Sequence, residues 1–173
     1  MNFKKLLSKI DLLFRKSNVP YMLVGGFAVA YWGYPRQSLG IDVVSDLMTK
    51  NLDEFLNNAK KLKFSFHKHE IELILKKGNR FVMELDDFRI DCWLPKTSFE
   101  KEALLNRKRK KLFGRDLYII GPEDLILSKL LIGRARDIED IKTILIRQGK
   151  KINKPLLNKR AAILNVAKSL SAL

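Results

Sequence analysis

Two adjacent glycines stand where an apolar strand would turn into a helix. Gly25 and Gly26 end the run YMLVGG, and the apolar stretch FAVAYWG follows directly. Glycine lets the backbone approach a ligand closely, and the N-terminus of the helix behind it attracts phosphate. The pair therefore indicates a phosphate-binding turn, although any tight turn also favours glycine.

Two aspartates lie inside expected strands, where a carboxylate is costly without a partner or a function. Asp42 stands between Ile41 and Val43 in GIDVVS, and its alternative is an edge-strand acid that faces solvent. Asp91 stands in FRIDCWL, where strand alternation puts it on the same face as Arg89. Taken alone, a structural ion pair between Asp91 and Arg89 is the better explanation of this second acid.

A charged group follows residue 120, in what we expect to be two helices. The stretch SKLLIGRARDIEDI places Lys129 four residues before Gly133, and Arg134, Asp137 and Asp140 follow at helical spacing. Such a group could face an anion held at the glycine turn. It could also form a solvated helix face with local ion pairs. Both interpretations stay open at this point.

The elements that would position these residues predict an α/β (α+β) protein, with helices packed on a small mixed sheet. The expected strands are 21–26, 40–45, 81–85, 88–94 and 116–120, and 69–80 is either helix or strand. The expected helices are 2–17, 27–33, 51–63, 122–133, 136–149 and 154–173, with 97–111 as helix or helix plus loop. Composition divides the chain into a mixed part, 1–120, and a helical part, 121–173, packed on the same domain.

Composition limits the class of protein. A net charge of +15 favours a polyanionic partner, most often nucleic acid, whereas the alternative is a lysine-rich soluble surface. The apolar content of 46% excludes wholesale disorder. The single cysteine, Cys92, excludes an internal disulfide and a cysteine-based zinc site. No apolar run is long enough for a membrane span, and the charged, amphipathic N-terminus does not read as a signal peptide, so we expect a cytoplasmic protein without a membrane partner.

Together, in order and spacing, these motifs resemble the nucleotidyltransferase superfamily that includes polymerase β. They are most similar to its minimal and toxin-like branches, of the AbiEii and MenT type. LVGGFAVAYWGYPRQSLGID matches the glycine turn and the first acidic strand, and RIDCWL matches the strand of the third acid. EDLILSKLLIGRARDIEDI resembles the downstream helix pair, so that the resemblance covers about residues 18–145 and makes 1–120 the nucleotidyltransferase core.

The resemblance implies transfer of an NMP from an NTP to an acceptor hydroxyl, with Mg²⁺ or Mn²⁺ as cofactor. It makes Asp42 and Asp91 the metal ligands and, with Lys129, the catalytic residues, while Asp137 and Asp140 support Lys129 or Arg134 from behind. The implied nucleotide-binding residues are Gly25, Gly26, Arg36, Ser38, Lys129 and Arg134. Arg36 fits a surface arginine equally well.

One position departs from the family pattern. The first metal strand carries Asp-x-Asp in the family, which sets two carboxylates about 7 Å apart on one face. This chain has Gly40 and Asp42, so a ligand position is taken by glycine and transfer should be impaired. Asp46 lies beyond the expected end of the strand and is a poor substitute. A glycine here fits either a naturally reduced member or a variant in which an acid was replaced.

The acceptor is predicted from charge and from the resemblance. The basic run 106–111 and the basic C-terminal residues could hold an RNA backbone, with the 3′ end of a transfer RNA as the first expectation. A protein hydroxyl, within a toxin–antitoxin pair, is the second, and a small-molecule antibiotic is the third. The rival class is a non-catalytic nucleotide- or RNA-binding module, or an antitoxin-like protein of the same fold. A plain DNA-binding domain would explain the charge but not the glycine turn or the acids in strands.

Overall fold

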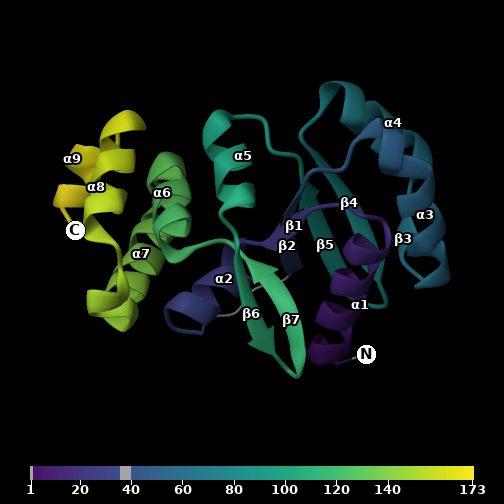
Figure 1. Ribbon diagram of the computed structural model, residues 1–173, viewed down its shortest axis with the longest axis horizontal. Coiled ribbons are helices and arrows are strands. Elements are labelled where there is room, and N and C mark those ends of the chain that lie inside the picture. Colours follow the sequence, from purple (N-terminus) through teal and green to yellow (C-terminus); the bar gives the residue numbers. More distant parts are fainter. Residues whose placement is uncertain (1, 36–39) are drawn as a thin grey trace.

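A single mixed sheet organises the chain. The computed structural model describes residues 2–35 and 40–173 (Figure 1), and within them seven strands follow the order β3-β4-β5-β2-β1-β7-β6. The pairs β1–β7 and β2–β5 are parallel, and the other neighbours are antiparallel. The strands are β1 Tyr21–Leu23, β2 Gly40–Ser45, β3 Ser65–Phe66, β4 Arg80–Leu85, β5 Phe88–Trp93, β6 Lys108–Leu112 and β7 Arg115–Ile119. The predicted α/β (α+β) class with a small mixed sheet is confirmed.

Helices connect these strands and form the C-terminal part of the chain (Figure 1). The α-helices are α1 Phe3–Lys16, α2 Gly25–Trp32, α3 Leu52–Lys61, α4 Lys68–Lys77, α5 Ser98–Leu105, α6 Pro122–Ile132, α7 Ala135–Gln148, α8 Lys154–Ile163 and α9 Ala167–Ser171. Two short 3-10 helices are η1 Thr49–Asn51 and η2 Gly149–Lys151. Among the described residues, no helix combines the length and the apolar character that a membrane crossing requires.

One face of the sheet packs on α1 and α3. The Phe14 ring of α1 stacks on Tyr21 of β1 and lies 5.3 Å, centroid to centroid, from Phe55 of α3. Phe55 in turn meets Phe81 of β4 edge to face. Because alternate residues of a strand point to opposite faces, burying this side leaves the polar residues of β2 and β5 on the other. That second face carries Asp42 and Asp91.

One buried ion pair and two neighbouring contacts attach α8 to α5 and α6. Arg160 of α8 donates to the Asp124 carboxylate in the first turn of α6, and both side chains are buried. The same guanidinium lies 3.3 Å from the Glu102 carboxylate of α5. The backbone N–H of Asn153, the N-cap of α8, also donates to Glu123 of α6 at 2.9 Å. Helices α5, α6 and α8 are therefore held together by these contacts. The division of the chain at residue 120 stays a prediction.

Most expected elements are present, and three segments needed the structure to decide between alternatives or to correct the expectation. The segment 69–80 is largely the helix α4. The segment 97–111 is α5 followed by β6, because residues 108–112 pair with β7. The single C-terminal helix expected over 154–173 is divided into α8 and α9. Asn165 adopts a left-handed conformation, with φ of 58°, and ends the first of them.

Candidate active site

A cleft of about 500 Å³ lies between the polar face of the sheet and the helices α5 and α6. Its polar wall brings together residues from three distant parts of the sequence: Gly25, Gly26, Asp42, Lys129, Arg134 and Asp137. Its apolar wall includes Met22, Val44, Trp93, Phe99, Ile120 and Leu125. A cleft with a few convergent polar groups on an otherwise apolar lining is the usual form of a small-molecule site.

The glycine turn lies directly against Asp42. Gly25 begins α2 with φ of +57°, a left-handed conformation that side chains with a Cβ adopt only at a cost. A Cβ at this position would come within 2.1 Å of Asp42 Oδ2. The N–H of Val24 donates to the Asp42 carbonyl at 3.0 Å, which holds the turn on β2. Glycine is thus required here both by the backbone and by the approach of the carboxylate.

Asp42 and Asp91 are neighbours across the parallel strands β2 and β5. They pair directly in the β2–β5 register, so both side chains leave the same face of the sheet. Trp93 Nε1 donates to Asp42 at 3.3 Å. Asp91 is held by two guanidinium groups, at 2.6 Å from Arg80 and at 3.0 Å from both Arg89 nitrogens that contact it. The ion pair with Arg89, the alternative reading of this acid, is therefore present.

Gly40 lies opposite Arg89 in the same register. A Cβ at Gly40 would lie 3.0 Å from the backbone carbonyl oxygen of Arg89, so the backbone of β5 would have to shift slightly. Asp46 follows the end of β2, where its N–H donates to the Pro20 carbonyl at 3.0 Å, and it does not line the cleft. The chain thus offers no further acid beside Asp42 on this strand.

The donor set does not fit a pair of metal ions. No group of three metal-ligating side chains occurs in the described ranges 2–35 and 40–173, and residues 36–39 contain no acid, histidine or cysteine. Both carboxylate oxygens of Asp91 already accept hydrogen bonds from arginine. One divalent ion could bind between Asp42 and Asp91, where it would compete with the two guanidinium groups for the Asp91 oxygens.

The third motif forms a buried charge network on the helical side of the cleft. Lys129 Nζ donates to Asp137 at 2.9 Å and to Asp140 at 2.7 Å, and only 7% of the lysine side chain is exposed. Arg134 Nε donates to the other oxygen of Asp137 at 2.7 Å. Gly133, left-handed with φ of 69°, turns the chain between α6 and α7 and so brings these residues together.

Electrostatics distinguish the two cations of this network. Burial raises the pKa of Asp137, but hydrogen bonds from Arg134 and Lys129 outweigh it, and the pKa lies below its ordinary value. The hydrogen bond to Asp137 is the largest cause of the raised pKa of Arg134, and the nearby charge of Asp42 contributes. Because 71% of the Arg134 side chain is exposed, Arg134 rather than Lys129 presents its charge to the cleft.

The structure brings most of the predicted site residues together. Asp91 adjoins the cleft through its pairing with Asp42, and Asp140 lies behind Lys129. Arg36 and Ser38 lie outside the described residues. Sequence reasoning missed Trp93 and Phe99 as cleft residues. Strand alternation already put Trp93 on the face of Asp91, whereas no sequence signal pointed to Phe99 of α5.

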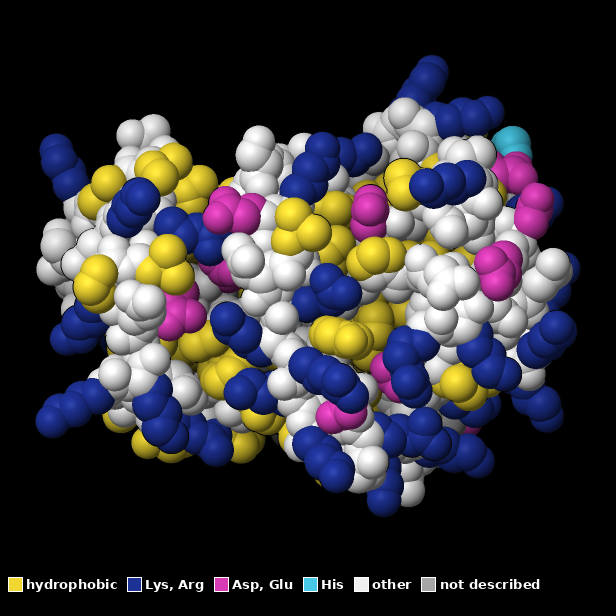
Figure 2. Space-filling model, viewed as in Figure 1, with side chains coloured by type: hydrophobic (Ala, Val, Ile, Leu, Met, Phe, Trp, Pro, Cys, Tyr) yellow, Lys and Arg dark blue, Asp and Glu magenta, His cyan; other side chains and the backbone are white. Residues whose placement is uncertain are grey.

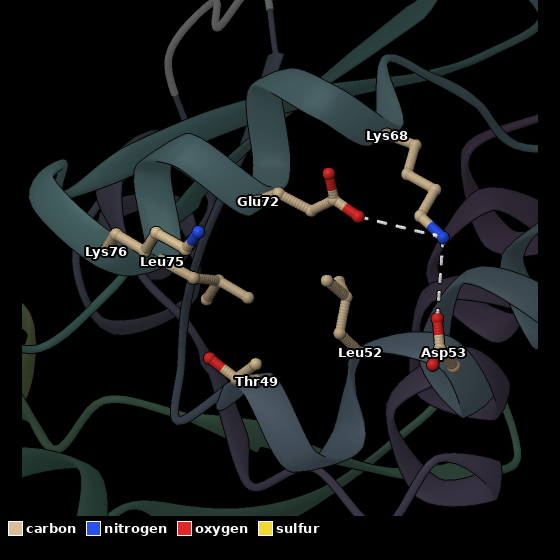
Figure 3. A pocket seen from close by; sticks show the side chains of 7 residues that line it. All are labelled: Thr49, Leu52, Asp53, Lys68, Glu72, Leu75 and Lys76. Carbon is tan, nitrogen blue, oxygen red and sulfur yellow. Dashed lines mark ion pairs between the residues drawn. The ribbon is translucent and has the colours of Figure 1, made fainter.

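A second cavity, of about 380 Å³, lies between η1, α3 and α4 (Figure 3). Lys68 and Lys76 are its cations, and Lys68 Nζ lies 3.6 Å from Asp53 and 3.7 Å from Glu72. Figure 3 shows the side chains of Leu52 and Leu75 pointing into the cavity, with Lys76 and Thr49 on the side away from Lys68. This cavity has neither a glycine turn nor a carboxylate on a strand, so the cleft is the candidate active site.

The fold and the cleft define a nucleotidyltransferase-like protein. Residues 1–172 match the model of the family described as "Nucleotidyltransferase of unknown function (DUF6036)", and the chain belongs to that family. No protein with a curated description matches the chain in sequence.

Solved structures share the fold at low sequence identity. The complex of ANT(2″)-Ia with adenylyl-2″-tobramycin has a TM-score of 0.61 and 15% identity, covering 94% of this chain and 96% of that one. A nucleotidyltransferase-like protein from Paracoccidioides brasiliensis has a TM-score of 0.55 and 13% identity, over 98% and 90%. The lincomycin-bound lincosamide adenylyltransferase LnuA has a TM-score of 0.53 and 17% identity, over 83% and 98%. At such identities the likeness establishes the fold alone.

Proposed function

We propose that the chain is a nucleotidyltransferase that binds an NTP in the cleft and moves its NMP to an acceptor hydroxyl, with transfer impaired by Gly40. The observation that carries this proposal is the convergence of the Gly25–Gly26 turn, Asp42 and Arg134 on one cleft. These residues come from three separate segments, and family membership supports the same chemistry.

Each wall of the cleft has a task in this proposal. The N-terminus of α2 behind Gly25 and Gly26 binds phosphate through backbone N–H groups, and Arg134 offsets the remaining charge. The apolar side, with Trp93 and Phe99, receives the nucleobase. Lys129 is a positioning residue, because its amine is held by Asp137 and Asp140 and sets the place of Arg134 through Asp137.

The reaction itself is a displacement at phosphorus. The acceptor oxygen bonds to the α-phosphorus, the bond to the bridging oxygen breaks, pyrophosphate leaves, and the hydroxyl proton passes to water. A Mg²⁺ or Mn²⁺ ion held by Asp42 and Asp91 would neutralise phosphate charge. The ion would compete with Arg80 and Arg89 for the Asp91 oxygens, and Gly40 supplies no further carboxylate.

The acceptor we propose is RNA, first of all the 3′ end of a transfer RNA, since the net charge of +15 favours a polyanion. A partner-protein hydroxyl, in a toxin–antitoxin pair of the AbiEii or MenT type, is the second acceptor. A small molecule is the third, in line with the tobramycin and lincomycin complexes of the similar structures. We place this activity in the cytoplasm.

A second candidate function is non-catalytic binding of nucleotide or RNA. The arginine pair on Asp91 favours it, because both oxygens of that carboxylate are engaged. Nucleotide binding in either function uses the same cleft, and the two functions differ in whether the NMP is transferred to an acceptor.

Nucleotide binding tests what the two functions share. We expect Gly25→Ala to weaken NTP affinity at least about tenfold, because its Cβ would displace Asp42 and strain the turn by about 1–2 kcal/mol. Gly114→Ala is the matched control: Gly114 is also left-handed, with φ of +78°, but a Cβ there meets nothing within 4 Å.

Isothermal titration of the full chain with each NTP, with and without Mg²⁺, measures these affinities. Equal affinity of the Gly25→Ala and Gly114→Ala variants would contradict the assignment of the cleft. A chain that binds no NTP at all would remove nucleotide transfer and non-catalytic nucleotide binding, and would leave only RNA binding.

A further inference from the structure

The β6–β7 hairpin ends in an unusual turn. Its two turn residues, Phe113 and Gly114, both have positive φ, of 52° and 78°. This is the geometry of a two-residue hairpin turn in which asparagine or glycine normally stands first. A large aromatic residue rarely adopts it. The chain thus keeps phenylalanine at a position that another residue would fill with less strain.

Phe113 does not stabilise the core from this position. Its side chain is 52% exposed, and it belongs neither to the core nor to the hydrophobic residues packed against it. The space beside Gly114 is open, since a Cβ there would meet no atom within 4 Å. Figure 1 shows the hairpin at the edge of the sheet, with its turn pointing away from α5 and α6. An exposed ring on a strained turn favours a role in binding.

Cations occur along the whole hairpin, and two of them lie beside its turn. The cations are Arg107, Lys108, Arg109, Lys110, Lys111 and Arg115. Figure 2 shows Lys and Arg side chains gathered over the lower centre of the molecule, where Figure 1 places β6 and β7.

Some of these cations are engaged by neighbours. Arg109 pairs with Asp116, and Lys110 lies over the Trp32 ring at 5.4 Å. Lys111 and Arg115 make no ion pair within the part of the chain that the structure describes. They are also the strand residues nearest the turn on either side, apart from Leu112.

Protection of an exposed strand edge is the simplest reason for such charge. Protection requires cations but no exposed aromatic ring at a strained turn. Single-stranded nucleic acid fits both features, because its phosphates pair with cations and any of its bases can stack on a ring. The net charge of +15 favours the same partner over an acidic peptide, which would offer no planar base.

We propose that the tip of the β6–β7 hairpin binds single-stranded RNA, with Phe113 stacked on a base and Lys111 and Arg115 on the flanking phosphates. This surface lies outside the cleft and goes beyond the proposed transfer reaction. Only the choice of RNA rests on the proposed function. Binding requires no NTP and no transfer, so the two proposals fail separately.

Phe113→Asn separates binding from folding. Asparagine suits the turn better, so the melting temperature should rise or stay the same. Affinity for a fluorescein-labelled oligouridine should fall about tenfold by fluorescence anisotropy, since a stacked ring is lost. Phe113→Tyr keeps the ring and should keep the affinity. Unchanged affinity of Phe113→Asn, or a tenfold loss in Phe113→Tyr, would overturn the stacking role.

The salt dependence of binding tests the cations. Lys111→Ala/Arg115→Ala should lower the slope of log affinity against log salt by about 1.4, or about 0.7 per phosphate contact. Lys60→Ala/Lys61→Ala removes two exposed cations in the last turn of α3 and should leave the slope unchanged. Equal slopes for both double variants would overturn the proposal. So would binding of duplex RNA or of single-stranded DNA that is tighter than binding of the single-stranded RNA.

Discussion

Gly40→Asp is expected to raise metal-dependent nucleotide transfer by about a hundredfold or more, which corresponds to about 2.7 kcal/mol in the barrier. The new carboxylate would leave the same sheet face as Asp42, two residues away, and would lie opposite Arg89 in the strand register. It could take over Arg89 and so free an oxygen of Asp91 for the metal ion. Transfer of label from an α-labelled NTP to total transfer RNA measures this change.

Gly40→Ala is the matched control for this variant. Both substitutions add a Cβ that lies 3.0 Å from the Arg89 carbonyl oxygen, so both should lower the melting temperature slightly and to a similar extent. Only Gly40→Asp adds a metal ligand. Transfer restored equally by both variants would show that the carboxylate is not the cause. If neither variant transfers label to RNA or to protein, the non-catalytic binding function is the one that remains.

Lys129→Met is expected to lower the free energy of unfolding by about 3–5 kcal/mol. The substitution keeps the size of the side chain but leaves Asp137 and Asp140 buried without their shared cation, which is costlier than never having had the pair. Lys142→Met is the control on α7, because its pair with Glu139 at 2.8 Å is exposed and should be worth less than about 1 kcal/mol. Urea unfolding of the two variants compares them, and equal losses would contradict the prediction.

Lys129→Met should also change how the free energy of unfolding depends on pH in the acidic range. In the parent chain the pKa of Asp137 is lowered in the folded state, so its contribution is complete above the ordinary value of 3.8 and is lost as the pH falls towards the lowered pKa. Removing Lys129 takes away one of the two cations that lower this pKa, so that Arg134 alone opposes the effect of burial. The loss of stability on acidification should therefore begin at a higher pH in Lys129→Met than in the parent, as unfolding at a series of pH values would measure.

The local parts of the candidate site followed from the sequence. Alternation in β5 separated Asp91 from the buried Ile90 and Cys92, and the glycine pair predicted the turn before α2. The direct pairing of Asp42 with Asp91 did not follow, because the parallel β2–β5 register is set by contacts between distant segments. Arg80 reaches Asp91 for a related reason, through the antiparallel pairing of β4 with β5.

The basic segment 106–111 was the least predictable part of the fold. Lysine and arginine are good helix formers, and nothing local in the run favours a strand. Its pairing with β7 decides the matter, since Leu117 and Ile119 of β7 are buried in the core. The Phe113–Gly114 turn carries only half of the usual hairpin signal, because phenylalanine stands where asparagine is expected.

The tie between Arg160, Asp124 and Glu102 couples the last helices of the chain to the cleft. Helices α5 and α6, which carry Glu102 and Asp124, also supply one wall of that cleft. Local opening of α8 would leave Asp124 without its buried cation and would loosen the wall. A ligand bound between the sheet and this wall therefore stabilises the closed position of α8, although it does not contact that helix. Occupancy of the cleft should slow amide hydrogen exchange in α8.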